Sequence, residues 1–357
     1  MIPYIVLLTV PILLYPFTKN TIVNHVKIDR LPLTLFFLFL TIMVVLRHPK
    51  IGNDTINYMH YFEQIARSGW NQIQWHNLEP GYQLFNKLLS FISGNSRFFL
   101  VAAGMAVSAM LFPIYHRLCV DAPLTIILFC NLSTFSMMFS GIRQMMAIGV
   151  GMIAYAFVLR KRPILFLLSV LVAKGFHTSA FMLLPMYPLY YARITKKGGF
   201  FTLPVLVLAF VFNRQIFRVL GTILESHTKY NADIMATGAY TTLLLFAIFA
   251  VFSFIVPEEQ VLDEETIGLR NFLLFSLVIQ MFAPLNMLAM RMNYYYIVFI
   301  PLLLPRIIAC ASVRYRSVAA WARNIMLVFF FVHFFARANS GINLHTIPYH
   351  FFWEQNL

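Results

Sequence analysis

The feature that most constrains this chain is a series of apolar runs, most of them close to the length that crosses a lipid bilayer. They lie at about 2–18, 31–46, 98–116, 123–139, 141–159, 163–173, 179–192, 200–213, 238–256, 270–288, 293–311 and 318–336. A spanning helix needs about 20 mostly apolar residues, because in lipid its backbone groups must all be hydrogen-bonded within the segment. Only 11% of the residues are charged, too few to cover a water-soluble core. The sequence therefore predicts an all-α integral membrane protein, in which 1–357 form a single transmembrane domain, a polytopic bundle of about 10–12 helices.

Basic residues gather in short runs between the apolar segments, the pattern that orients a membrane protein with its positive loops in the cytoplasm. We interpret the net charge of +14 as this topology signal, and we expect no nucleic-acid partner. Clusters at 160–162 and 193–197 flank the short runs 163–173 and 179–192. Both clusters are cytoplasmic only if the two short runs form a hairpin that crosses the membrane twice. This topology has about twelve spans, with both termini outside.

The longest stretch without an apolar run, 47–97, is predicted to lie outside, and 213–237 forms a second outer loop. The acidic stretch 257–265 is predicted to be a solvated inner loop. The first outer loop mixes carboxylates with aromatic rings: Asp54, Glu63, Glu79, Tyr58, Tyr61, Tyr82, Trp70 and Trp75. Rings stack on the apolar faces of sugars and carboxylates accept hydrogen bonds from hydroxyls, so this composition favours sugar binding. The same aromatic residues would also suit amphipathic helices in the membrane interface.

Three basic residues, Arg143, Lys174 and Arg291, fall in short outer turns, against the bias of basic residues for the cytoplasmic side. Charged residues at membrane depth are costly and mark functional sites by default. Arginine holds phosphate oxygens with two parallel hydrogen bonds and keeps its charge when desolvated. Arg143 and Arg291 are therefore candidates for binding a lipid pyrophosphate. The alternative is that all three side chains reach out to lipid headgroups.

His177 is a candidate general base, because imidazole titrates near neutral pH and can take a proton from a sugar hydroxyl. The alternative is a packed, hydrogen-bonded histidine at a helix end. The sequence has no phosphate-binding glycine loop, no Gly-x-Ser-x-Gly motif and no metal ligands at a recognisable spacing. We therefore expect no metal, no cofactor and no chemistry driven by nucleotide hydrolysis.

Several short motifs resemble the EpsG-like proteins, a branch of the Wzy-type polymerases of O-antigen and exopolysaccharide. They are Gly52-Asn53-Asp54 with Tyr58 and Phe62, Glu79-Pro80-Gly81-Tyr82, Ile142-Arg143-Gln144 with Ala147, and His177-Thr178-Ser179-Ala180 ending at Pro185. Arg291 with Tyr295, and Ile347-Pro348-Tyr349, match more loosely. Each motif is short, but their order, their spacing and their common side of the membrane are fairly specific. Together they span most of the chain.

The resemblance implies a membrane glycosyltransferase related to the GT-C type, in the bacterial inner membrane, with its active site and both outer loops facing the periplasm. The donor would be a glycan on undecaprenyl pyrophosphate, and the acceptor the terminal sugar of one lipid-linked repeat. Besides membrane lipids, a chain-length regulator would be a partner. In this scheme Arg143 and Arg291 neutralise the departing pyrophosphate, and His177, or its rival Asp54, takes the acceptor proton. The substrate contacts would be Glu79, Gln144, Tyr58, Tyr82, Lys174 and Tyr295.

Three other functions share part of this pattern. A flippase for the same lipid-linked repeat also needs cationic phosphate contacts, but we expect it to hold them in a central cavity rather than at outer helix ends. A membrane acyltransferase that modifies surface glycans would use a histidine that faces the cytoplasm, whereas His177 is predicted to lie outside. A non-enzymatic assembly subunit would tolerate the loss of Arg143.

Overall fold

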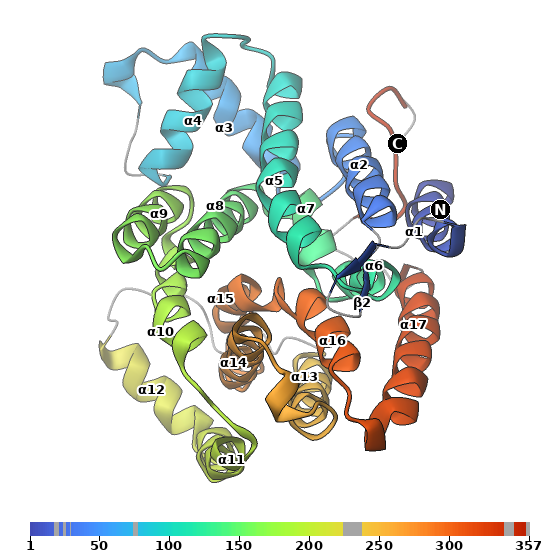
Figure 1. Cartoon of the computed structure of the whole chain (residues 1–357). Helices are drawn as coiled ribbons and strands as arrows, with labels where there is room; N and C mark the ends of the chain where they lie inside the picture. Colours follow the sequence, from blue (N-terminus) through green and yellow to red (C-terminus); the bar gives the residue numbers. More distant parts are fainter. Residues whose placement is uncertain are drawn as a thin grey trace. The chain divides into compact units, whose positions relative to one another are not determined.

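Helices form from most of the apolar runs and make up nearly all of the regular structure in the computed structural model (Figure 1). The structure describes residues 1–17, 21–23, 26–28, 30–73, 78–223, 238–338 and 346–354. Two short strands, β1 (Thr21–Val23) and β2 (Val26–Ile28), pair antiparallel. Within the described residues, the all-helical prediction is therefore confirmed apart from this one strand pair.

The chain divides into two compact units. The first consists of Met1–Leu184 with Asn324–Leu357, and the second of Pro185–Arg323. The helices of the first unit are α1 (Ile2–Leu14), α2 (Leu31–Leu46), α3 (Thr55–Arg67), α4 (Pro80–Ser90), α5 (Ser96–Leu118), α6 (Ala122–Asn131), α7 (Thr134–Ser140), α8 (Ile142–Leu159) and α9 (Pro163–Phe176), with 3-10 turns at Tyr15–Phe17, Trp70–Gln72 and Thr178–Leu183. Those of the second unit are α10 (Met186–Tyr191), α11 (Lys196–Val211), α12 (Asn213–Ile223), α13 (Ala239–Ile255), α14 (Glu264–Gln280), α15 (Met287–Ile297) and α16 (Ile300–Ala309), with 3-10 turns at Glu259–Val261 and Val313–Tyr315. The last helix, α17 (Arg316–Ala338), begins in the second unit and ends in the first, and a single transmembrane domain remains a prediction.

Three helical stretches are long and apolar enough to cross a membrane: Ser96–Leu118, Ile142–Leu159 and Val313–Arg337. Two bent pairs, α6 with α7 at 56° and α15 with α16 at 48°, raise the number to five if each pair is one span. These counts apply to the described part of the chain alone. The larger number of spans expected from the sequence stays a prediction, because other apolar runs form shorter helices, such as α9.

Helices α8 and α9 pack against each other and are joined by the basic turn at 160–162. Helix α9 ends at Phe176, and the chain then enters a short 3-10 turn at His177. Gly151 lets this returning segment come close to α8, since a Cβ at that position would lie 3.0 Å from Leu183 Cδ2. The stretch from 163 to 192 is therefore not one continuous helix.

The outer loop predicted at 47–97 folds into two amphipathic helices rather than an irregular loop. Helix α3 packs against α4 and α5, and α4 also packs against α9. Phe62 of α3 stacks on Phe99 of α5, with ring centroids 5.2 Å apart. Of the aromatic residues predicted for this loop, Trp75 lies outside the described residues, as does 224–237 of the second predicted loop.

In the second unit, two arginines bind the acidic stretch at 257–265. Arg270 is fully buried and donates two hydrogen bonds to the Glu259 carboxylate, at 2.8 and 3.1 Å. Arg306 pairs with Glu265 at 3.0 Å. Most of the stretch is exposed, as the solvated loop predicted from composition would be, and these ion pairs also tie it to α14 and α16.

The chain segment 346–354 closes the first unit by packing on the C-terminal end of α2. The Tyr349 hydroxyl donates to the Met43 carbonyl at 2.8 Å, and the Phe352 N–H donates to the Leu46 carbonyl at 3.0 Å. The last carbonyls of a helix have no partner within the helix itself. The segment supplies these partners, and it thereby ties the end of the described chain to its first apolar helices.

Candidate functional site

An ion pair joins the segment 47–97 to the start of α8. Arg143 Nη1 donates to Glu79 Oε2 at 2.6 Å, and Glu79 Oε1 accepts the Thr178 backbone N–H at 3.3 Å. Glu79 precedes α4, Arg143 lies in the first turn of α8, and Thr178 follows α9, so segments far apart in the sequence meet at one carboxylate. The side chains of Arg143 and Glu79 are 27% and 10% exposed. This partial burial strengthens their attraction relative to an open surface.

Two tyrosine rings pack beside the arginine. Tyr58 and Tyr82 meet edge to face with centroids 6.0 Å apart, and the Arg143 guanidinium carbon lies 5.9 and 6.0 Å from those centroids. A cation at such a distance is attracted to the ring. Tyr82 is fully buried, and burial raises the pKa of its hydroxyl, so the phenol stays neutral near pH 7. Because both rings are buried, the structure favours a role for them in positioning Arg143, and their predicted contact with sugar stays a prediction.

The motif Gly52-Asn53-Asp54 is anchored beside the end of α7. The Asn53 N–H donates to Ser140 Oγ at 3.1 Å. Gly52 has a φ of +86°, and a Cβ there would collide with the Phe139 carbonyl oxygen, so glycine is required at this close approach. Asp54 follows directly and is half-buried at the start of α3. This anchoring places Asp54 near the junction of α7 and α8, where the ion pair also lies.

The imidazole of His177 has a defined orientation. Its Nδ1 accepts the Ser179 backbone N–H at 3.2 Å and lies 2.7 Å from the Ser179 hydroxyl oxygen. A backbone N–H can only donate, so Nδ1 must offer its lone pair, and in the neutral ring the proton then sits on Nε2. His177 therefore presents a hydrogen-bond donor at Nε2 rather than a proton acceptor.

A contact between two glycines sets the separation of α4 and α9. A Cβ at Gly81 would lie 2.8 Å from the carbonyl carbon and oxygen of Gly175. Any side chain at this position would push the two helix ends apart. Glu79 is two residues before one glycine and His177 is two residues after the other. The glycine contact therefore brings the carboxylate and the imidazole to the same place.

The remaining predicted site residues are Gln144 and Lys174 of the first unit and Arg291 and Tyr295 of the second unit. Gln144 is buried at 4% exposure next to Arg143 in the chain, whereas Lys174 is exposed in the last turn of α9. Arg291 and Tyr295 belong to α15 of the second unit, where Arg291 is exposed and Tyr295 is 1% exposed. Their contact with substrate stays a prediction, and so does the action of Arg291 beside Arg143.

Sequence reasoning missed the roles of two residues that build the site, Ser179 and Gly175. The only signal for Ser179 was its place two residues after His177. Among the residues that the structure describes, no three His, Cys, Asp or Glu side chains come together as a metal site requires. The cluster can bind an anion at Arg143, donate a hydrogen bond from His177 and take up a proton on a carboxylate.

The comparisons with known proteins point to one family. The model of the EpsG family matches residues 30–351. No curated protein and no solved structure matches the chain. The matched range contains all of the site residues described above, from Gly52 to Ser179.

Proposed function

Because this chain belongs to the EpsG family, we propose that it is a membrane glycosyltransferase that joins lipid-linked oligosaccharide repeats into a polysaccharide. Membership of the family points to a polysaccharide polymerase in general. The observation that carries the finer proposal is the partly buried Arg143, held by Glu79 and the two tyrosine rings beside His177. A pyrophosphate is the natural ligand of such an arginine, because it offers paired oxygens to the guanidinium.

In the proposed reaction, a hydroxyl oxygen of the acceptor sugar attacks the anomeric carbon of the donor. The bond between that carbon and the pyrophosphate oxygen breaks, and the lipid pyrophosphate leaves with the electron pair. Arg143 stabilises the negative charge that develops on the leaving oxygen, where a preorganised cation has its largest effect on rate. We propose a metal-independent reaction of this kind at the periplasmic face of the inner membrane, with undecaprenyl pyrophosphate as the carrier and a relationship to the GT-C type.

The acceptor proton must pass to a base, and the geometry favours a carboxylate over His177. With Nδ1 accepting from Ser179, His177 is suited to donate from Nε2 to an oxygen of the substrate. Asp54, half-buried close to the α7–α8 junction, is the first choice as base. Glu79 takes that role if the pyrophosphate displaces it from Arg143.

Two substitutions of His177, by glutamine and by asparagine, distinguish a hydrogen-bond donor from a general base, because each amide side chain reproduces a different nitrogen of the imidazole ring. The amide nitrogen of glutamine falls near Nε2, whereas asparagine reproduces only the Nδ1 side. We expect His177→Gln to keep polymer formation within about ten-fold of wild type, and His177→Asn to lose at least ten times more. Polymer yield in a complemented deletion strain measures both. If His177 were the general base, both variants would lose polymer formation equally. If its role were purely structural, the asparagine variant would keep polymer formation.

Deletion of the gene tests the function itself. We expect the surface polysaccharide ladder to collapse to a band that carries a single repeat, because repeats still cross the membrane and only their joining fails. A gel stained for surface polysaccharide shows this directly, and a plasmid copy of the gene must restore the ladder. Loss of even the single-repeat band, with lipid-linked repeats accumulating inside, would instead identify a flippase.

A further inference from the structure

An exposed tryptophan near the end of the described chain is supported by a second aromatic ring. Trp353 lies parallel to Phe351, with ring centroids 4.5 Å apart and 11° between the ring planes. Phe352 meets the indole edge to face, with centroids 4.9 Å apart. The indole is still 55% exposed, and because Phe351 covers one of its faces, the other face is the one open to a ligand. We call Trp353 and Phe351 the aromatic platform.

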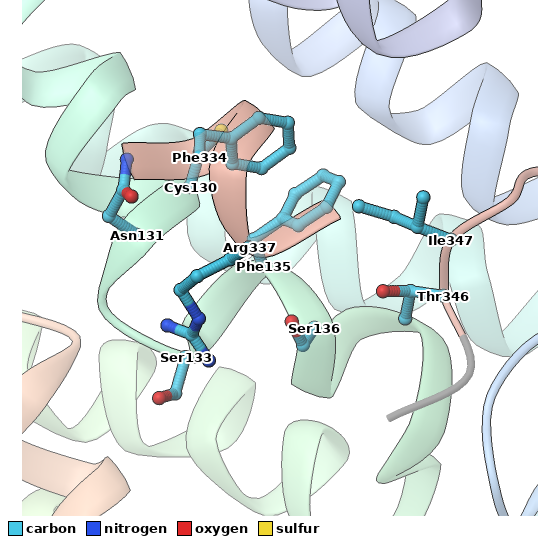
Figure 2. Close-up of a pocket in the computed structure, with 9 residues that line it drawn as sticks. All are labelled: Cys130, Asn131, Ser133, Phe135, Ser136, Phe334, Arg337, Thr346 and Ile347. Carbon is cyan, nitrogen blue, oxygen red and sulfur yellow. The ribbon is translucent and has the colours of Figure 1, made fainter. Parts of the chain in front are cut away.

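The chain segment that carries the platform is fixed in the first unit. At its beginning, Thr346 and Ile347 line a small cavity together with side chains of α6, α7 and α17 (Figure 2). The Tyr4 hydroxyl donates a hydrogen bond to the Thr346 carbonyl. Further along, the Arg97 guanidinium carbon lies 4.2 Å from the centroid of the Phe352 ring. A ring held in this way has little freedom left to lose when a ligand stacks on it.

A carboxylate lies directly beside the platform. Glu354 Oε1 accepts the Phe351 backbone N–H at 3.0 Å, and Glu354 Oε2 lies 2.8 Å from His350 Nδ1. The hydrogen bond from the Phe351 N–H and that from His350 lower the pKa of Glu354, so the carboxylate is ionised at neutral pH. Each carboxylate oxygen has a further lone pair, so Glu354 can also accept hydrogen bonds from a ligand.

This combination of groups favours a sugar ring as the ligand. An open aromatic face matches the apolar face of a sugar, and the neighbouring carboxylate matches its hydroxyls. An indole that anchors a protein in the membrane interface can be equally exposed. The Glu354 carboxylate disfavours that role for Trp353, because an ionised group is costly to bring into apolar lipid and is repelled by anionic headgroups.

The platform lies at the start of the segment that carries Asp54. The His48 N–H donates to the His350 carbonyl at 2.9 Å, which joins the two chain segments here. Asp54 follows His48 by six positions, so the two residues are at most about 21 Å apart even in a fully extended chain. A glycan of a few sugars can therefore reach from the platform to the proposed base.

We propose that the aromatic platform, with Glu354 beside it, is a binding subsite for a sugar ring of the polysaccharide chain. The ring would stack on the open face of Trp353 while the end of the glycan reacts near Asp54 and Arg143. This inference rests on the proposed function, because a polymerase must hold the glycan as well as the lipid pyrophosphate to which it is attached. It adds a sugar contact away from the reacting bond.

Binding of an oligosaccharide to the purified full chain in detergent tests the subsite. The probe is a fragment of two repeats, released by mild acid from the surface polysaccharide of the host, and a titration followed by saturation-transfer difference NMR gives its dissociation constant. We expect Trp353→Ala to weaken binding by about ten-fold or more, because tryptophans at binding surfaces often carry much of the binding energy. Trp353→Tyr keeps an aromatic face and should stay within about three-fold of wild type.

The matched control is Trp321→Ala, which removes another exposed indole, on α17, and should leave the affinity unchanged. If Trp353→Ala fails to fold, Glu354→Gln is the second variant. It keeps an acceptor oxygen but removes the charge, and we expect it to weaken binding by about three-fold or more, because hydrogen bonds to a charged acceptor are the stronger ones.

The outcomes separate this inference from the proposed function. Equal affinity of wild type and Trp353→Ala, or no binding by wild type, would overturn the subsite, whereas collapse of the ladder on gene deletion would still support a polymerase. Quenching of the Trp353 emission by brominated phosphatidylcholine, taken as the difference between wild type and Trp353→Ala, would place the indole in lipid and also overturn the subsite. If the deletion strain keeps its ladder while the chain binds the oligosaccharide through Trp353, the proposed function fails and the glycan subsite remains.

Discussion

Replacing Arg143 with alanine is expected to lower polymer formation by about 100-fold or more, while the protein still reaches the membrane. The guanidinium is the group that would face the charge developing on the leaving pyrophosphate, and loss of one such donor costs about two to three powers of ten in rate. Its position between Glu79 and the two tyrosine rings makes it the most constrained cation of the site. Polymer yield per amount of membrane-inserted protein measures the effect. Arg67→Ala, which removes an exposed arginine from α3, is the matched control.

A charge swap separates catalysis from structure at this ion pair. Arg143→Glu combined with Glu79→Arg restores a pair of opposite charges in the same place. We expect the double variant to recover thermal stability in detergent but not polymer formation, because the cation then sits on α4 instead of α8. Recovery of the polymer by the swap would show that the pair serves the fold alone, and it would remove Arg143 from the proposed mechanism.

Gly81→Ala is expected to produce the second-largest effect, a loss of at least ten-fold in polymer yield. Its new Cβ would meet the backbone of Gly175 at 2.8 Å, closer than real Cβ atoms come to other heavy atoms. Backbone cannot move aside as a flexible side chain can, so α4 must shift away from α9. The shift would separate Glu79 from the turn that carries His177. Yield is again measured against membrane-inserted protein.

The control for this variant lies in the same segment, 47–97. Gly94 follows α4, and a Cβ at that position would meet no atom within 4 Å. Gly94→Ala should therefore leave polymer yield within about two-fold of wild type, because surface substitutions away from special features have small effects. Equal activity of the Gly81 and Gly94 variants would show that the close glycine contact is not needed by the site.

Sequence analysis reached the helical membrane class because hydropathy acts locally and needs no knowledge of partners. It also singled out Arg143 and His177, since a charged or titratable group beside an apolar run is conspicuous, and it named Glu79 as a carboxylate among the aromatic rings of the 47–97 segment. It did not pair Glu79 with Arg143, because the two residues are 64 apart and nothing local specifies that meeting. The orientation of His177 was also out of reach, because it depends on a single backbone N–H, that of Ser179.

Two other structural features could not be predicted from the sequence for a related reason. The apolar run at 123–139 was expected to form one span, yet it breaks after Asn131, where isolated polar residues are too few to interrupt a hydropathy pattern. The ion pairs of the acidic stretch at 257–265 were not predicted, because its partners Arg270 and Arg306 stand within later apolar runs. In both cases the decisive contact is made by a residue elsewhere in the chain.

The first unit is discontinuous, and this has a consequence for how the protein is made. A ribosome would release Met1–Leu184 long before Asn324–Leu357, and the whole second unit is translated in between. Parts of a chain generally fold as units in the order in which they emerge. This unit, however, lacks the end of α17 and the contacts of 346–354 with α2 until translation is nearly finished. A prematurely terminated chain would therefore contain Glu79, Arg143 and His177 but lack the contacts of 346–354 with α2 that complete the unit.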